Sequence, residues 1–265
     1  MLKKIIKHTS KPNMAYIVLG YSYLPYQDCG LDAYYLATQS MYKLSKDIQS
    51  QLRNNGSYAQ IVNDVSLRTL AFCSGLCTIW GINQMAMRED SGSYIVLGAI
   101  ETDDVGVVRN ATGEYIEAST KCMDCKLCVD KCPTRAIGIN GEFDPNKCLR
   151  KFQSGGVMPI EIADLMGAKF LGCDICQAVC PHNRDIQRIQ APQYVQQALY
   201  NSINTIRPFR DIIGANYARP KYLTVNSIVY SAHSKYTHAI PSLHKLSQDV
   251  MYAQLVDWAI SKIED

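Results

Sequence analysis

Eight of the eleven cysteines in this chain of 265 residues stand in two short runs and at one isolated position. The first run is Cys122-x2-Cys125-x2-Cys128-x3-Cys132-Pro133, the second is Cys173-x2-Cys176-x3-Cys180-Pro181, and Cys148 lies between them. A tight loop with a cysteine at every third residue turns three thiolates toward one small inorganic core, as a [4Fe–4S] cube requires. The spacing therefore predicts two [4Fe–4S] clusters and electron-transfer chemistry.

In two-cluster modules of the ferredoxin type, the cysteine before the proline leaves its own loop and ligates the other cluster. By this crossing rule the two cubes share the two runs and lie close together. The predicted ligands of one cluster are Cys122, Cys125, Cys128 and Cys180. The predicted ligands of the other are Cys132, Cys148, Cys173 and Cys176.

Zinc sites and disulfides are the two alternatives for such cysteines. Zinc sites usually present paired CxxC motifs, or CxxC with histidines, whereas a triple run ending in Cys-Pro and met by a second Cys-Pro has little reason to exist for zinc. The first eight residues, Met1 to His8, hold no long apolar stretch that could serve as a signal peptide. We therefore expect a cytoplasmic, reducing compartment, in which disulfides are rare.

Length and charge set wider limits. A chain of 265 residues can hold two or three structural units with a real core. No stretch approaches the roughly 20 apolar residues of a membrane helix, so we expect a soluble protein with no membrane partner. The net charge of +3 permits a nucleic-acid partner without demanding one.

The predicted fold class is α+β in three units. Residues 1–118 form an α/β sandwich, residues 119–190 a ferredoxin-like module for two [4Fe–4S] clusters, and residues 191–265 a helical tail. In the first unit, apolar runs predict strands at 15–20, 58–62 and 92–100, and helical spacing predicts helices at 31–53 and 66–73. Strands that alternate with helices favour the sandwich.

The other two units have their own patterns. Residues 136–139 and 142–144 predict a small hairpin beside the clusters, and 159–166 predict a short helix. In the tail, residues 223–229 and 255–261 occupy similar places in two units about 32 residues apart, with a helix at 239–246 between them. This resembles a truncated HEAT-like repeat. A plain cap of three or four helices fits the same pattern.

Several stretches together resemble the epoxyqueuosine reductase family, whose members are corrinoid-dependent iron–sulfur enzymes acting on tRNA. Leu171-Gly172-Cys173-Asp174-Ile175-Cys176-Gln177-Ala178-Val179-Cys180-Pro181-His182-Asn183 is similar to the family's GCD-x-CQ-x-x-CP-x-N signature. Gly92-Ser93-Tyr94-Ile95-Val96-Leu97-Gly98 resembles its GS-aromatic-x-x-LG strand, and Ser74-Gly75-Leu76 its AGL turn. The stretch from Ile213-Gly214 through Arg219-Pro220 to Asn226 resembles the start of its helical tail.

This resemblance implies a function and a cofactor site. The clusters would relay electrons to a cobalamin, and the epoxide of epoxyqueuosine in tRNA would be reduced to queuosine. An electron donor such as flavodoxin or ferredoxin would supply the electrons. Cofactor contacts are implied at Gly75, Ser93, Leu97, Cys173 and Asp174.

The chain departs from the family pattern at four places. It lacks a longer N-terminal region that contributes to the family's corrinoid pocket. The family's GLGW-x-GK turn is replaced by residues 75–81, and its Ser-Tyr-Leu-Thr-like run after the lone cysteine is replaced by Leu149-Arg150-Lys151-Phe152. The proton-donating aspartate of the family lies in a D-x-x-P-x-x-E stretch, which here begins at Asp64 without the proline and the glutamate.

Asp64 is therefore the candidate proton donor, because opening an epoxide needs protonation of the departing oxygen. The alternative is a turn residue after Asn63. Cys73 and Cys77 share a helical spacing that could face a cofactor, but free cysteines are usually small buried apolar residues, and Cys29 has the same alternatives. His182 either covers a cluster edge or is an ordinary surface histidine.

Basic and aromatic residues between 184 and 222 are the candidates for tRNA contact, since cations bind phosphates and aromatic rings stack on bases. A solvated helical surface with buried tyrosines is the alternative. The same chemistry leaves two other functions open: an electron-transfer protein without its own corrinoid chemistry, and a corrinoid-dependent reductase of a small molecule. The candidates are Arg184, Arg188, Arg207, Arg210, Arg219, Lys221, Tyr194, Tyr200, Tyr217 and Tyr222.

Overall fold

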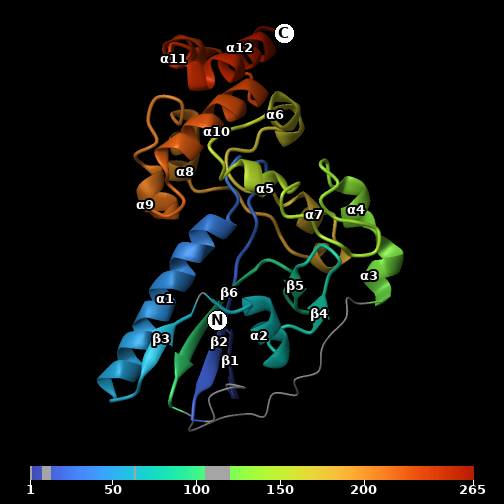
Figure 1. Ribbon diagram of the computed structural model, residues 1–265, viewed down its shortest axis with the longest axis vertical. Helices are drawn as coiled ribbons and strands as arrows, with labels where there is room; N and C mark the ends of the chain where they lie inside the picture. Colours follow the sequence, from blue (N-terminus) through green and yellow to red (C-terminus); the bar gives the residue numbers. More distant parts are fainter. Residues whose placement is uncertain (1, 8–12, 63, 105–119) are drawn as a thin grey trace.

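A computed structural model describes residues 2–7, 13–62, 64–104 and 120–265. The molecule is elongated, with a sheet at one end, the cysteine-rich loops in the middle and a stack of helices at the other end (Figure 1). The C-terminus lies at the outer end of the helical stack.

The sheet has four strands in the order β1-β2-β6-β3, and every pair is antiparallel. Its strands are β1 (Leu2–Lys7), β2 (Ala15–Ser22), β3 (Ala59–Ile61) and β6 (Ile95–Thr102). Side chains alternate between the two faces of a strand, so Ile17 and Leu19 join the core on one face and Tyr16 and Val18 the core on the other.

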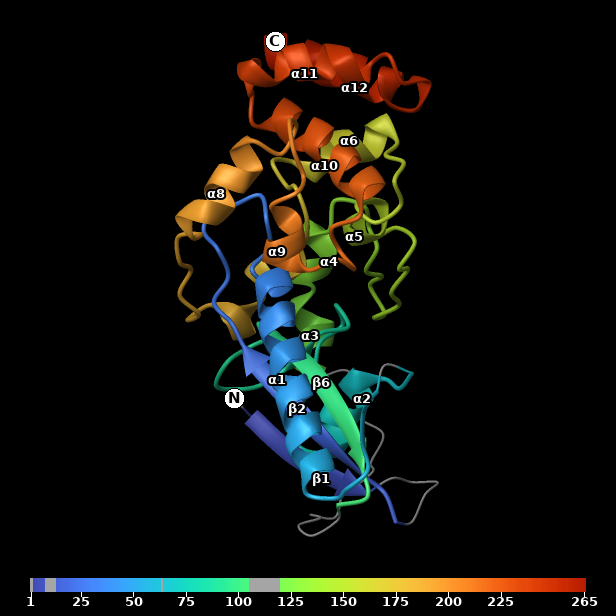
Figure 2. The same cartoon turned by 90° about the vertical axis from the view of Figure 1, so that its left-hand side faces the viewer.

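Helix α1 (Tyr34–Asn54) covers one face of the sheet, as Figure 2 shows. The helix approaches the sheet closely at Gly98, where an added Cβ would lie 3.0 Å from Met41 Sδ and that side chain would have to shift. The helix ends at Asn55, and Gly56 follows with a φ of +83°, a conformation that glycine adopts without strain.

Helix α2 (Leu67–Cys73) packs against the opposite face. The Ser66 hydroxyl caps its start by accepting from the Thr69 N–H, and the chain turns at Gly75 with a φ of +67°. A small hairpin of β4 (Ile79–Trp80) and β5 (Ala86–Met87) then leads toward the cysteine-rich loops.

Short helices make up the cysteine-rich module. Ile137 and Phe143 form a single antiparallel bridge, which confirms the predicted hairpin in minimal form. The helices are α3 (Thr120–Cys125), α4 (Leu127–Lys131), α5 (Leu149–Phe152), α6 (Ile160–Met166), α7 (Ile175–Ala178) and the 3-10 turn η1 (Pro181–Asn183).

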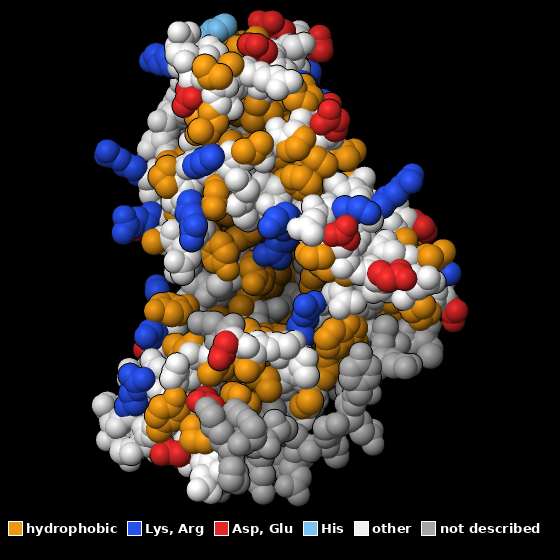
Figure 3. Space-filling view, in the orientation of Figure 1, with side chains coloured by type: hydrophobic (Ala, Val, Ile, Leu, Met, Phe, Trp, Pro, Cys, Tyr) orange, Lys and Arg blue, Asp and Glu red, His pale blue; other side chains and the backbone are white. Residues whose placement is uncertain are grey.

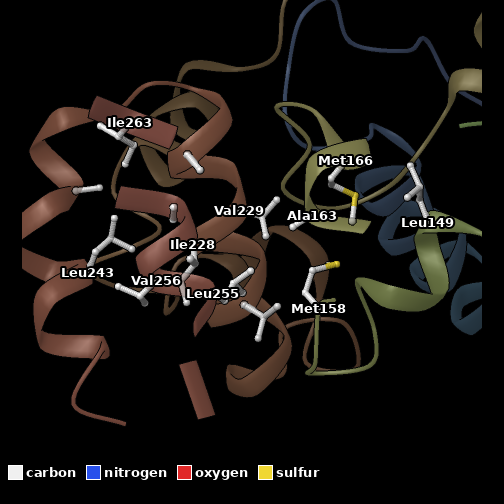
Figure 4. Close-up of a cluster of buried hydrophobic side chains, with 14 residues drawn as sticks. Leu149, Met158, Ala163, Met166, Ile228, Val229, Leu243, Leu255, Val256 and Ile263 are labelled. Carbon is white, nitrogen blue, oxygen red and sulfur yellow. The ribbon is translucent and has the colours of Figure 1, made fainter. Parts of the chain in front are cut away.

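The tail is helical throughout its regular structure. Leu149, Met166 and Ile228 belong to one buried core that joins α5 and α6 to the tail (Figure 4). A second core joins Leu31 and Tyr35 at the start of α1 to Phe209 and Leu223 of the tail. The tail elements are α8 (Gln193–Tyr200), α9 (Phe209–Ile213), α10 (Pro220–His233), η2 (Thr237–Ala239), α11 (Ile240–Leu246) and α12 (Val250–Glu264).

The mixed helix and strand composition confirms the predicted fold class at a coarse level. The predicted elements are present with their starts moved by up to three residues, since α1 begins at Tyr34 and β6 at Ile95. The boundaries at 118 and 190 and the HEAT-like repeat stay predictions. No helix in the described part of the chain is long and apolar enough to cross a membrane.

Candidate metal centre

The thiols gather in two groups that follow the crossing rule. Burial raises the pKa of Cys128 to about 11, and Cys180, Cys122 and Cys125 are the other thiols that raise it. Burial also raises the pKa of Cys180, with Cys122 and Cys125 adding to the rise. The mutual influence of these thiols places Cys180 with the first run, although it is 48 or more residues away in the chain. We call Cys122, Cys125, Cys128 and Cys180 the first thiol group.

The second thiol group consists of Cys132, Cys148, Cys173 and Cys176. Burial raises the pKa of Cys176, and all three other members of the group raise it further. Cys128 of the first group also acts on Cys176, so the two groups adjoin each other. Helices α4 and α7 are in contact and bring the two groups together.

Local backbone geometry explains the crossing. A residue that precedes proline is driven into extended conformations, and Cys132 and Cys180 have ψ values of 111° and 127°. In both cysteine loops the backbone therefore becomes extended at the cysteine before proline. This change of direction turns its thiol away from the preceding thiols. Lys126 between Cys125 and Cys128 has a φ of +52°, a left-handed conformation that tightens the first loop.

The first thiol group lines a cavity of about 220 Å³. The opposite wall comes from the β4–β5 hairpin, through Ile82 and Met87, and His182 closes one side. The Cys180 thiol lies 3.9 Å from Met87 Sδ. The structure thus places His182 beside the cysteines, as one of the two sequence interpretations proposed.

Four thiols spread around a cavity suit a polynuclear cluster, whose irons keep the sulfur ligands apart.

The second thiol group is anchored by backbone and charge. The Ala136 N–H donates to Cys132 Sγ at 3.3 Å, and Cys173 packs against the core shared with the tail. Beside it, Asp174 accepts from Lys169 at 3.2 Å and from Arg188 at 3.0 Å. Burial alone would raise the pKa of Asp174, but these two cations outweigh it and the pKa is lowered. Asp174 is thus an ionised, paired carboxylate.

Two family-like motifs are joined by a buried network of hydrogen bonds. The Asn183 side chain donates to Ser93 Oγ at 2.8 Å and accepts from the Ser93 N–H at 2.8 Å. Gln177 donates to Ser93 Oγ and to its carbonyl oxygen, both at 3.1 Å. Gly92 is required here, because an added Cβ would collide with Asn183. This hydrogen-bond network joins the start of β6 to the cysteine-rich loops.

A buried network beside the second thiol group was not predicted. The Arg150 guanidinium lies over the Tyr34 ring at 4.6 Å and the Tyr35 ring at 5.5 Å. Burial raises the pKa of Asp32, whose Oδ1 accepts from the Tyr34 N–H while Oδ2 has no hydrogen-bond partner among the described residues. The sequence signal was the replacement run at 149–152, but its partners lie more than a hundred residues away.

The other predicted site residues lie in varied surroundings. Asp64 is exposed between β3 and α2, and an added Cβ at Gly75 would meet nothing within 4 Å. Leu97 is partly buried in the core under α2. Cys77 is buried in the same core and Cys73 packs against it partly buried, as expected for small apolar residues.

Some of the candidate tRNA contacts are exposed side chains, and others are engaged in contacts within the protein. Arg188 is engaged, because it binds Asp174, the Tyr94 hydroxyl at 3.2 Å and the Tyr26 carbonyl at 3.0 Å. Tyr217 is engaged as well, with its ring 4.9 Å from that of Tyr35, and Tyr222 is partly buried. The exposed ones are Arg184, Arg207, Arg210, Arg219, Lys221, Tyr194 and Tyr200.

Residues 121–183 match the family described as the 4Fe-4S double cluster binding domain. This match shows a module for two clusters and accounts for both thiol groups. The epoxyqueuosine reductase of Lactococcus garvieae is 26% identical over 253 residues, which cover 89% of this chain and 70% of that protein. The enzyme of the same name from Bacillus anthracis is 32% identical over 197 residues, 69% of this chain and 50% of that protein. The chain belongs to the epoxyqueuosine reductase family.

The fold agrees with solved members of this family. A structure of epoxyqueuosine reductase with an epoxyqueuosine-modified stem loop of tRNA-Tyr superimposes with a TM-score of 0.69. The identity is 24%, and the match covers 95% of this chain and 73% of that one. The chain spans only about half the length of several curated relatives, including the one from Bacillus anthracis.

Proposed function

We propose that this protein is an iron–sulfur oxidoreductase that reduces the epoxide of epoxyqueuosine in tRNA to queuosine. The carrying observation is the pair of adjoining thiol groups, one of which lines a cavity between the cysteine loops and the β4–β5 hairpin. Two neighbouring clusters can pass electrons one at a time. Removal of the epoxide oxygen consumes two electrons. An external donor of the flavodoxin or ferredoxin type delivers these electrons in turn.

The tRNA substrate is supported by the exposed cations and by the family. Arg207, Arg210, Arg219 and Lys221 are exposed around α9 and the start of α10. Exposed cations provide salt-dependent phosphate contacts. The solved relative described above holds a tRNA stem loop that carries epoxyqueuosine, and we extend this substrate class to the present chain. Such an activity belongs in the cytoplasm.

Cobalamin is the expected last carrier, and it would supply two-electron chemistry at cobalt when bound. The five residues expected to touch it do not fit this role as a set. Ser93 and Asp174 have protein partners for their polar atoms, and Leu97 lies in the core under α2. A hollow between the sheet end and the helical end, bordered by hydrophobic and basic side chains, is the alternative place for a large cofactor (Figure 3).

Asp64 is the proposed proton donor to the departing epoxide oxygen. Its exposure leaves the carboxyl accessible to a substrate, and it lies just before α2 at the sheet end of the molecule. The residues that hold the clusters carry no proton for this step, because thiolates bound to iron are already deprotonated.

The first experiment is anaerobic reconstitution followed by titration with cob(II)alamin, read by electron paramagnetic resonance. Stoichiometric binding with an altered cobalt signal supports the corrinoid, and conversion of epoxyqueuosine in a tRNA stem loop by the reduced protein supports the reaction. A protein that contains about eight irons per chain, ignores cobalamin and leaves the stem loop unchanged would contradict the proposal.

An electron-transfer protein without corrinoid chemistry is the second candidate. The observation in its favour is the saturation of Ser93 and Asp174 by protein partners. That function predicts rapid reduction of an external acceptor by the reconstituted protein with no dependence on cobalamin. A small-molecule corrinoid reductase, in contrast, would bind cobalamin and leave tRNA untouched.

A further inference from the structure

A cavity of about 570 Å³ outside the thiol groups lies between the helical tail and the segment 27–29. Its walls are the end of α8, the end of α10 with the turn after it, and the segments 27–29 and 190–191. No cysteine of either thiol group lines it. A cavity of 300–1,000 Å³ is the size class of small-ligand sites, and neither the clusters nor the proposed proton donor uses this one.

The cavity is lined by aromatic rings and by side-chain amides. Three tyrosines and three glutamines line the cavity. A glutamine side chain carries both a donor and an acceptor, which matches the mixed edges of a nucleobase, and tyrosine rings stack on its faces. The lining residues of this kind are Gln27, Gln190, Gln196, Tyr200, Tyr230 and Tyr236.

The rim offers a ring for stacking. Tyr200 is the last residue of α8 and is 65% exposed, although a tyrosine usually buries most of its ring. Tyr236 meets it edge-on, with ring centroids 5.7 Å apart and planes at 84°. This contact constrains the orientation of Tyr200, and the exposure of its side chain leaves ring surface available to a ligand.

Left-handed backbone conformations and close side-chain packing fix the walls of the cavity. Asp28 and Lys235 line the cavity and have φ values of +44° and +50°, the left-handed region that residues other than glycine rarely adopt. The Tyr230 ring packs directly on Gly30, where an added Cβ would collide with it. The cavity shape is thus set by the surrounding chain.

The charge of the walls argues against a phosphate as the buried group. Lys235 is the only lysine or arginine that lines the cavity, and Asp28 lies in the same wall. The ligand class is therefore a neutral, planar group with donors and acceptors on its edge.

We propose that this cavity takes an unstacked base of the RNA substrate, with Tyr200 as the stacking ring and the glutamine amides at the base edge. This inference rests on the proposed tRNA substrate and adds a base-binding site in the tail. Single-stranded loops present such splayed bases, which are read by stacking and by hydrogen bonds to their edges.

The test uses the full reconstituted chain and a fluorescent RNA stem loop carrying epoxyqueuosine, at one fixed salt concentration because phosphate contacts depend on salt. Tyr200→Ala is expected to weaken binding about 5- to 100-fold, the range for loss of one stacked base. Tyr200→Phe keeps the ring and should bind within about twofold of the wild type. Tyr42→Ala removes a similarly exposed tyrosine, 54% exposed, from α1 and should change nothing.

Photocross-linking supplies an independent readout. A stem loop with 5-iodouridine placed in turn at each loop position should give an adduct on Tyr200 or Tyr236, identified by mass spectrometry. Wild-type protein that fails to bind the stem loop contradicts the proposed function itself. Stem-loop binding that is equal in the wild type and Tyr200→Ala, without an adduct at these tyrosines, overturns the base site alone.

Discussion

The first thiol group borders an open cavity, with Cys125 exposed, whereas the second lies against the core that joins α5 and α6 to the helical tail. The second group also has charged neighbours, with Lys169 and Arg188 paired to Asp174 beside Cys173. Solvent exposure and nearby charge set the potential of an iron–sulfur cluster. Two clusters of one type in one module are therefore expected to differ in potential and in accessibility.

This difference suggests a division of labour between the clusters. The cluster of the first group would occupy the cavity that its four cysteines line, and the exposed Cys125 leaves that site accessible to a partner or an acceptor. The four cysteines of the second group are each partly buried, and ion pairs and the Arg150 network lie beside them. The predictions that follow test whether the two sites are separable.

The largest effect is expected from removing one ligand of each group. Cys176→Ser should abolish the cluster of the second group and Cys128→Ser that of the first, so that iron falls from about eight to about four per chain. Colorimetric iron analysis and electron paramagnetic resonance of the reduced proteins measure this. Cys77→Ser is the control, since Cys77 is buried in the sheet core. A variant of either group that loses all iron would show that the sites are not separable.

A large effect on turnover alone is expected at Asp64. Asp64→Asn should lower single-turnover reduction of the stem-loop substrate by about 10²- to 10⁴-fold, the usual contribution of a general acid. Iron content should stay at the wild-type level, because Asp64 is exposed and far in sequence from both cysteine runs. Undiminished turnover would remove the proton-donor role, and Asp47→Asn on the exposed side of α1 serves as the matched control.

A moderate effect is expected at Asp174. Asp174→Asn removes a negative charge beside the second thiol group and leaves Lys169 and Arg188 uncompensated. The reduced cluster is the more negative form, so its potential should rise, by a shift on the order of 60 mV, which is tenfold in a one-electron equilibrium. Redox titration followed by electron paramagnetic resonance measures the shift.

The Asp174 comparison has a matched control in the sheet end. Asp90→Asn breaks a similar ion pair, to Arg88 at 2.6 Å, and should leave both potentials unchanged. Equal shifts of both cluster potentials in Asp174→Asn would contradict the assignment of this charge to the second group.

Sequence reasoning predicted the chemistry of the site better than its surroundings. The gathering of the cysteines into two groups could be predicted because loop spacing and the extended residue before proline, as at Cys132 and Cys180, are local features. Which cysteine ligates which cluster stays a prediction. Strands β1, β4 and β5 were missed, whereas the other strands and helices of the sheet end were predicted to within three residues for the same local reasons. The antiparallel order β1-β2-β6-β3 was not, since pairing is a long-range choice.

The surroundings depend on contacts between distant segments. The Asp32–Arg150 network and the cavity behind Tyr200 combine side chains that no spacing rule connects. Ser93 and Asp174 were expected at a cofactor on the strength of motifs. Their motifs also hold the sheet end to the cysteine loops and neutralise Lys169 and Arg188, and sequence alone does not separate these roles.

The smallest expected effect is on stability, at the ion pair that links α6 to α12 of the tail. Asp164 on α6 accepts from Trp258 Nε1 at 3.2 Å and from Lys262 Nζ at 2.9 Å on α12, and the Lys262 hydrogen bond lowers its pKa. A lowered folded pKa means that the stabilisation is present above the unfolded value of about 3.9 and is lost as the pH falls through the folded value. Asp164 is 49% exposed, so the pair contributes at most about 1 kcal/mol.

Asp164→Asn should therefore lower the melting temperature slightly at pH 7 and have less effect near pH 3, which differential scanning calorimetry of the reconstituted protein can follow. Glu264→Gln at the exposed end of α12, the helix that carries the partners of Asp164, is the control. A looser tail should also speed iron release to a chelator from the second group while leaving the first unchanged, because only the second packs on the core that includes the tail. Release that accelerates equally from both groups would show that the tail does not enclose the second cluster selectively.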